Sequence, residues 1–303
     1  MKVNTQSHIA ERVAQTETAN IKGRSLWADA RVRLFRNKAA VTSMVILGSI
    51  VFLAIFADLF SPHAFDDQDW DRISQPPTLE EFHIFGTDGV GQDIFIRTLH
   101  GARVSLAVGV IATFVALTIG VLYGATAGFI GGRVDELMMR IVDVLYAMPF
   151  IFFVIILMVI FGRNIYLLFF ALGAVQWLTM ARIVRGQTLT IKGREFIEAA
   201  EAAGVGRMTM IMRHIVPNVI GPVLVYITLT IPAVILEESF LSFLGLGVQP
   251  PMASWGGLIA EGAPEMEGAP WMLVFPAIFM AVTLFCFNFI GDGLRDALDP
   301  KDR

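Results

Sequence analysis

The chain has 303 residues, of which 55% are hydrophobic and only 17% are charged, against about 25% in an ordinary soluble domain. The net charge of −4 gives the chain as a whole no electrostatic footprint for nucleic acid. The single cysteine, Cys286, excludes an intramolecular disulfide framework and a cysteine zinc site.

Six stretches are apolar and long enough to cross about 30 Å of hydrocarbon, which takes about 20 residues. The sequence therefore predicts an all-α integral membrane protein with six transmembrane helices. Their approximate ranges are 39–60, 104–130, 141–162, 164–184, 216–238 and 270–291.

The segment before the first span, residues 1–38, is too long and too polar for a signal peptide. The first span, 39–60, is therefore predicted to be an uncleaved anchor. From Arg31 to Lys38, four basic residues surround Leu34 and Phe35. This pattern predicts an amphipathic helix on the lipid of the inner leaflet, and a disordered tail is the alternative.

Basic residues predict the orientation, because they accumulate on the cytoplasmic side of a membrane protein. Of the 23 Lys and Arg, 19 fall in residues 1–38, 131–140, 182–213 and the tail 292–303. Both termini are therefore predicted to be cytoplasmic. Residues 61–103, between the first two spans, are predicted to be a periplasmic segment.

No nucleotide, metal or catalytic site is predicted. The stretch GTDGVGQD, from Gly86 to Asp93, lacks a preceding buried strand and is interpreted as a turn. The histidines are scattered without metal-ligand spacing, and no cofactor is expected; they are His8, His63, His83, His100 and His214.

Acidic residues near the span ends are candidates for other roles. Asp143 is expected to pair with nearby Arg140. Glu237 and Glu238 lie at the predicted outer end of the fifth span, and structural anchoring of a gate is favoured there over direct contact with substrate. Pro232, in the same span, is predicted to bend the helix and shape the translocation pathway.

The uncharged stretch from Ser239 to Ala260 could be taken for a seventh span. Its glycines and the pair Pro250-Pro251 would break a helix in the middle. It is therefore predicted to be a half-helix followed by an external loop.

The longest polar interruption in the last two-thirds of the chain is EFIEAAEAAGVGRMTMIMRHIVPN, from Glu195 to Asn218. Alanine and glutamate predict a short helix, and Gly204 a turn after it. An apolar stripe at helical spacing predicts a second, amphipathic helix; it consists of Met208, Ile211, Met212 and Ile215. From the residues alone, a helix pair lying on lipid headgroups remains an equal alternative.

This segment resembles the EAA loop of permease subunits in binding-protein-dependent ABC importers. Glu198, Ala199, Ala200, Gly204 and Pro217 match the family pattern, whereas His214 and Val216 depart from it. The stretches FGTDGVGQD, ESFLSFLGLG and FNFIGDGLRDALDPKDR are similar to the peptide/nickel branch, although Gln92 stands where that pattern has Arg. The extended N-terminal segment is similar to the C subunits of bacterial oligopeptide importers.

The resemblance implies a type I ABC importer permease fold in the bacterial inner membrane, with the transmembrane domain at 104–291 and the coupling loop at 195–217. It implies three kinds of partner: a second permease subunit in a heterodimer, two cytoplasmic ATPase subunits and a periplasmic peptide-binding protein. The chain itself would catalyse nothing. Oligopeptides are the expected cargo, with dipeptides, nickel or glutathione as alternatives, and an ion-coupled secondary transporter is a second class. The residues expected to couple to the ATPases are Glu195, Glu198, Ala199, Ala200, Gly204 and Pro217.

Overall fold

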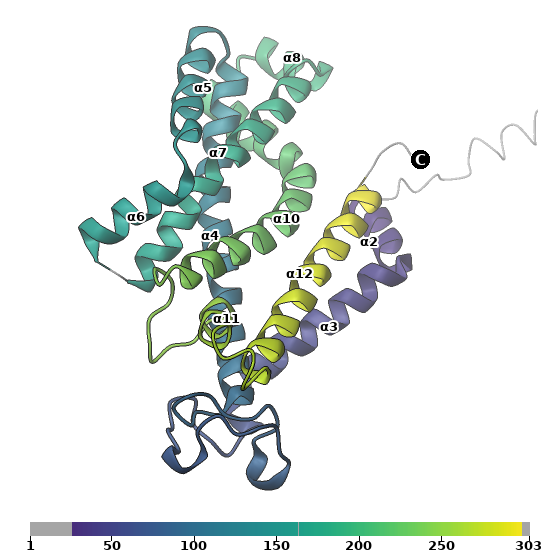
Figure 1. Cartoon of the computed structure of the whole chain (residues 1–303). Helices are drawn as coiled ribbons and strands as arrows, with labels where there is room; N and C mark the ends of the chain where they lie inside the picture. The colour runs from purple at the N-terminus through teal and green to yellow at the C-terminus, as the bar shows by residue number, and fades with distance from the viewer. Residues whose placement is uncertain (1–25, 163, 299–303) are drawn as a thin grey trace, which may run out of the picture.

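The computed structural model describes residues 26–162 and 164–298, and every regular element in these ranges is helical. The prediction of an all-α chain is confirmed. Short 3-10 turns, η1 (Ala57–Leu59), η2 (Trp70–Arg72) and η3 (Glu80–Phe82), lie between the first two long helices. The helices in Figure 1 are α2 (Leu26–Arg36), α3 (Lys38–Ile55), α4 (Ile94–Ile130), α5 (Gly132–Ala147), α6 (Phe150–Phe161), α7 (Ile165–Lys192), α8 (Glu195–Ala202), α9 (Arg207–Met210), α10 (Val216–Phe243), α11 (Trp255–Gly262) and α12 (Trp271–Leu298).

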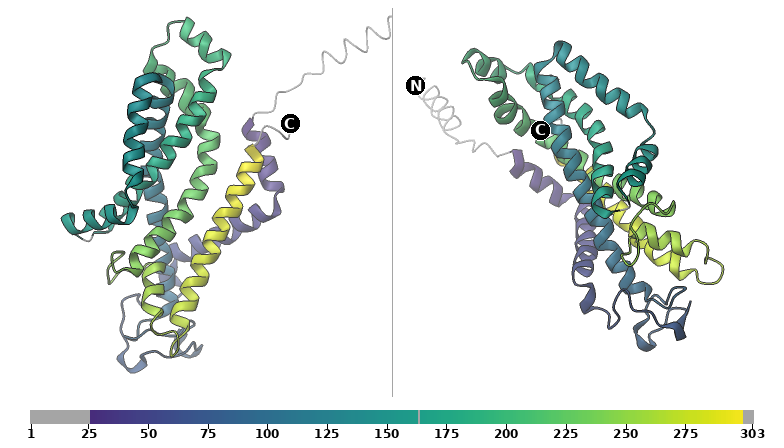
Figure 2. Two further views of the ribbon diagram at one scale, coloured as in Figure 1. Left: turned by 45° about the horizontal axis from the view of Figure 1, so that its top comes forward. Right: turned by 90° about the vertical axis from the view of Figure 1, so that its left-hand side faces the viewer.

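The two ends of the molecule differ (Figure 1). Helices α5 and α8 lie at one end, and the irregular segment between α3 and α4 lies at the other. Within residues 26–162 and 164–298, five helices are long and apolar enough to cross a membrane, and the bent pair α5–α6 brings the number to six if it is one span. Figure 2 shows α3 and α12 side by side, next to the group of α4, α7 and α10. The loop around α8 and the segment after α3 therefore lie at opposite ends of the spans, as the charge distribution predicts.

Helix α4 begins at Ile94, well before the predicted start at residue 104. The Asp93 side chain accepts a hydrogen bond from the Ile96 amide at 2.9 Å and so caps the helix. With 37 residues, α4 is about 55 Å long, almost twice the hydrocarbon thickness. Helix α4 is therefore longer than a membrane crossing requires, because helical turns capped by Asp93 precede the apolar run that predicts a start at residue 104. The first span is shorter than predicted, because α3 ends at Ile55 and a 3-10 turn follows.

The third predicted span, 141–162, is wrong as a single helix. Helices α5 and α6 meet at an angle of 82°. The break falls at Met148 and Pro149, where Met148 is extended with ψ 129°. Proline restricts the preceding residue to such a conformation, which ends a helix. Helix α5 also includes residues that the sequence assigned to a loop at 131–140.

The stretch from Ser239 to Ala260 contains no seventh span. Helix α10 continues to Phe243 and ends in a turn at Gly245, where φ is +74°. Helix α11 then forms after the loop, and the sequence did not predict it. Its Trp255 is fully buried and donates from Nε1 to the Thr98 carbonyl of α4 at 3.1 Å. The external loop is thus folded back onto the outer part of α4.

The helix predicted near Arg31 is confirmed as α2, which packs against α12. Its exposed apolar side chains include Trp27, Val32 and Phe35. Its position on the inner leaflet remains a prediction. Most of the predicted N-terminal segment, residues 1–25, lies outside the described part of the chain.

Helices α4 and α7 make the most extensive helix contact in the described part of the chain. Gly120, Gly124 and Gly128 of α4 face α7 at intervals of four residues, a small-residue pattern that lets two backbones approach. A β-carbon on Gly124 would lie 2.3 Å from the Ala181 carbonyl oxygen. From the other side, a β-carbon on Gly173 of α7 would lie 2.7 Å from the side chain of Val115. No side chain fits between these helices at this separation.

We expect Gly124→Ala to destabilise the protein by roughly 1–3 kcal/mol, because the added methyl group must push α4 away from α7. Gly186→Ala is the matched control, since Gly186 lies on α7 with no atom within 4 Å of its β-carbon position. Thermal denaturation of the purified proteins in detergent measures the difference. Equal denaturation temperatures for the two variants would show that the helices can separate without cost.

Candidate functional site

The candidate coupling loop connects α7 to α10 at the end of the molecule where α5 also lies (Figure 1). Helix α8 buries only Ile197, which joins one apolar cluster with Phe129 of α4 and Val184 of α7. The Lys192 ammonium group, at the end of α7, donates to the Phe129 carbonyl at 2.6 Å. The helix is therefore attached to the ends of the spans by one side, and its other side is open.

Gly204 ends α8 in a left-handed turn. Its φ is +79°, a region that residues with a β-carbon rarely adopt. The Gly204 amide donates to the Glu201 carbonyl at 2.9 Å, and the Val205 amide donates to the Ala200 carbonyl at 3.1 Å. These two bonds form a Schellman motif. The turn expected from the sequence at Gly204 is confirmed.

The open side of α8 carries most of the residues expected to couple. Glu195, Glu198 and Ala199 are exposed, and Ala200 is half-buried. Pro217 is exposed near the start of α10, directly after the π turn at Ile211–Ile215. The acidic residues lie in the first turn of α8, where the helix dipole favours negative charge. The loop therefore presents a thin, acidic face that another protein can approach closely.

The apolar stripe predicted between Met208 and Ile215 is wrong in part. Ile211 and Ile215 are buried, but Met208 and Met212 are exposed, and Met210 is buried in their place. The reason is a π turn at Ile211–Ile215, which adds a residue to the helical repeat and changes the residues that face inward. The exposed methionines extend the apolar part of the open surface next to α8.

Ion pairs attach α5 to α7 beside the loop. The Arg185 guanidinium donates to both carboxylate oxygens of Asp135, each at 2.6 Å. Asp143 pairs with Arg182 at 2.8 Å, so the expected pair with Arg140 is wrong. Arg140 instead lies 3.5 Å from Glu136, one turn earlier on α5. Arg140 was expected to pair with Asp143 because the two are close in sequence, whereas the packing of α5 against α7 brings Arg182 to Asp143.

The two glutamates of α10 have different surroundings. Glu238 is fully buried, and its Oε1 accepts from the hydroxyl groups of Ser242 at 2.7 Å and Ser254 at 2.8 Å. Glu237 is half-buried and accepts from the Gln176 side-chain amide at 2.7 Å. The contacts of Glu238 are those of a structural anchor. The Glu237 residue is partly exposed at the surface of α10.

Pro232 is buried inside α10, and the helix continues through it to Phe243. The ribbon of α10 curves along its length (Figure 1). A second proline, Pro222, lies in the same helix. The contribution of Pro232 to the curvature and to a pathway remains a prediction.

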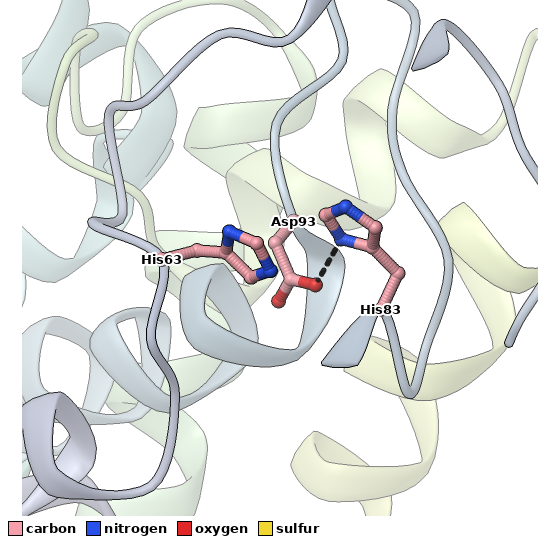
Figure 3. Close-up of side chains that lie close together, drawn as sticks. All are labelled: His63, His83 and Asp93. Atoms are coloured by element: carbon pink, nitrogen blue, oxygen red, sulfur yellow. Dashed lines mark hydrogen bonds and ion pairs between the residues drawn. The ribbon is translucent and has the colours of Figure 1, made fainter. Parts of the chain in front are cut away.

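The structure brings together side chains that the sequence does not connect. His63, His83 and Asp93 have ligand atoms within 4.8 Å of one another, at the end of the molecule opposite the coupling loop (Figure 3). Their separations along the chain match no metal-binding motif, and only the folding of the segment between α3 and α4 unites them. The turn predicted for Gly86 to Asp93 is present, with Asp88 also buried in it.

Comparison with known proteins gives concordant results. The family model described as "Binding-protein-dependent transport system inner membrane component" matches residues 116–303, and "N-terminal TM domain of oligopeptide transport permease C" matches residues 25–77. The "Oligopeptide transport system permease protein OppC" of Haemophilus influenzae is 55% identical over 97% of this chain and 94% of its own length. The protein of that name in Escherichia coli K12 is 56% identical over 95% of both chains.

The fold also resembles a solved structure. A chain of the MetNI methionine ABC transporter in an inward-facing conformation aligns with a TM-score of 0.55. The alignment covers 66% of this chain and 94% of the other, with 17% identity. At this identity the likeness concerns the fold alone.

We expect Glu238→Ala to destabilise the protein by about 1–3 kcal/mol, because the buried hydroxyl groups of Ser242 and Ser254 lose their acceptor. Glu238→Gln keeps an acceptor oxygen and should cost less. Glu237→Ala is the comparison at a half-buried site with one partner. Denaturation of the purified variants in detergent tests this order, and a Glu238→Ala protein as stable as the wild type would contradict the anchoring role.

Proposed function

The chain belongs to the family of binding-protein-dependent transport system inner membrane components, and we propose that it is the permease subunit through which an ATP-driven importer carries oligopeptides. As an ABC transporter permease it works with ATPase and binding-protein partners and is not itself a catalytic subunit. The cargo is inferred from relatives more than half identical to this chain over almost its whole length.

The observation that carries the proposal is the open face of α8. Its acidic residues and most of its small alanines are exposed, while Ile197 packs α8 into the apolar cluster that it shares with α4 and α7. The Lys192 contact joins the ends of α7 and α4 next to it. A partner that binds this face can therefore move the spans with it. We infer that two cytoplasmic ATPase subunits bind here and on a second permease, and that Glu195, Glu198, Ala199 and Ala200 contact them.

A second permease subunit is needed for a pathway between two chains. Helix α10 has an exposed apolar stripe on one side, made of Leu229, Leu236, Phe240 and Phe243. Such a surface suits lipid or another helix bundle. We infer that the second permease is a different chain, so that the pair is a heterodimer, and that Pro232 and Glu237 lie close to the pathway. A periplasmic peptide-binding protein would deliver cargo at the end of the molecule that carries residues 61–93.

We expect Gly204→Val to leave the chain in the membrane but to abolish coupling. Valine at a φ of +79° costs at least roughly 1–2 kcal/mol, which is enough to unwind the end of α8 and weaken ATPase binding about tenfold. Glu198→Lys reverses one exposed charge and should have a milder effect. The measurement is ATPase activity in reconstituted vesicles, with and without peptide-loaded binding protein, beside a pull-down of the ATPase subunits.

Gly206→Val is the matched control for this experiment. Gly206 is also exposed and has no neighbouring atom within 4 Å of a β-carbon, but its φ of −65° suits any residue. In Gly206→Val vesicles, the stimulation of ATPase activity by peptide-loaded binding protein should stay close to that of the wild type. Normal stimulation of ATPase activity in Gly204→Val vesicles would contradict a coupling role for α8. It would favour the alternative of a helix pair that lies on lipid headgroups.

The cargo is tested in the same vesicles. Binding protein loaded with longer peptides should stimulate ATP hydrolysis and uptake, whereas dipeptides, nickel and glutathione should not. If only one of these alternatives stimulates ATP hydrolysis and uptake, the permease role stands and the cargo is that compound instead of oligopeptides. Uptake driven by an ion gradient without ATP would contradict the importer class.

A further inference from the structure

We propose that His63, His83 and Asp93 form a binding site for a divalent transition-metal ion such as Zn²⁺ in the segment between α3 and α4. Two imidazole groups and one carboxylate are a ligand set that zinc uses in proteins, with a fourth position filled by another oxygen donor. The three side chains come from separate parts of the segment, and their ligand atoms lie within 4.8 Å of one another (Figure 3). The site is independent of the coupling loop and of the cargo.

Two of the three side chains are already held in place. His83 and Asp93 are buried, and the His83 Nδ1 atom lies 2.8 Å from Asp93 Oδ2. The other oxygen of Asp93, Oδ1, accepts the Ile96 amide as the cap of α4, which fixes the direction of the carboxylate. A preorganised pair of this kind loses little side-chain freedom when an ion binds.

The third side chain has room to adjust. His63 is half-buried, its ring stacks on His83 with centroids 4.4 Å apart, and its Nε2 atom lies 2.8 Å from the Glu81 carbonyl oxygen. Ligand atoms around tetrahedral zinc are about 3.4 Å apart. Because the two rings are nearly parallel, with an interplanar angle of 11°, the His63 side chain must both move by roughly an ångström and turn to direct a ring nitrogen at the ion. The Glu81 carbonyl is in reach as an additional oxygen donor.

The surroundings favour a cation. A cavity of about 470 Å³ opens onto the three side chains and is also lined by Asp67, Asp69 and Asp71. Asp69 is partly neutralised by Arg72 at 3.3 Å, whereas Asp67 accepts a hydrogen bond from the Ala64 amide at 3.1 Å. The negative potential of these carboxylates raises the local concentration of cations at the mouth of the site. Water can reach the fourth coordination position through the same cavity.

A bound ion would join the outer ends of two spans. His63 follows α3, and Asp93 begins α4, so the ion connects both ends of a segment that contains only short 3-10 turns. Binding to the folded segment stabilises it in proportion to the logarithm of the ion concentration. We expect zinc to protect residues 64–82 from opening and from proteolysis.

The test uses the full-length chain purified with its partner subunits in nanodiscs, treated with EDTA and then freed of it. Zn²⁺ is titrated in competition with a chromophoric chelator, and Co²⁺ binding is followed by visible absorption. The wild type should bind one ion that His63→Asn and His83→Asn each weaken about 100-fold or more. Asp93→Asn keeps a side chain able to cap α4 and should weaken binding about 10- to 100-fold.

His100→Asn is the matched control, because His100 also lies outside the membrane and contacts a carboxylate, Asp58, at 2.8 Å but has no second imidazole as a ligand partner. A hydrogen bond from Arg103, and then one from His100, hold the pKa of Asp58 below its usual value. Zinc affinity should be unchanged in this variant. An equal loss in His100→Asn would contradict the site.

Limited proteolysis separates loss of the site from loss of the fold. Without zinc, the His63→Asn and His83→Asn proteins should be cleaved like the wild type. With zinc, cleavage between residues 64 and 82 should slow in the wild type only. The proposal is overturned if the wild type binds no ion saturably, if both histidine variants bind as tightly as the wild type, or if zinc leaves the wild-type cleavage rate unchanged.

Discussion

The close approach of α4 and α7 determines how the other helices can be placed. Gly120, Gly124 and Gly128 allow the two backbones to touch, and in a membrane such packing replaces the hydrophobic effect as the source of helix association. Because α4 has no side chain at these three positions, Met180, Val184 and Thr188 of α7 pack directly against its backbone. The Lys192 ammonium contact with the Phe129 carbonyl and the apolar cluster around Ile197 are built on the ends of these two helices.

This arrangement makes the coupling loop part of the bundle's core at one end. The cluster that contains Ile197 also includes Met210 and Ile215 below the loop and Val219 of α10. Helix α8 therefore contacts α4, α7 and the start of α10 through one continuous set of side chains. A connection of this kind would carry a displacement of α8 to the spans, as the proposed rigid-body alternating access requires. Gly204 matters because it closes α8 tightly enough for Val205 to return to that cluster.

The sequence predicts best what depends on composition and local conformation. Hydropathy locates the spans because polar groups are excluded from hydrocarbon, and Gly204 is recognisable because a left-handed helix end requires a residue without a side chain. The early start of α4 was missed, since its cap at Asp93 lies in a polar stretch. Pro149 alone would have predicted the bend, but the long apolar run around it favoured a single span. The π turn and the meeting of His63 with His83 depend on tertiary packing and have no local signal.

The buried carboxylate of Glu238 connects α10 to α11. Ser254 donates to Glu238 and also accepts the Gly257 amide at 3.1 Å, so that one hydroxyl group joins α10 to the cap of α11. The backbone amide of Trp255 then donates to the Ser105 hydroxyl of α4 at 3.1 Å. The other oxygen of Glu238, Oε2, is buried without a hydrogen-bond partner among the described residues, so this connection depends on Oε1 alone. Because α10 follows the loop around α8, Glu238 lies on a helix that connects this loop to α11. Side-chain contacts along α10 therefore connect the two ends of the helix bundle.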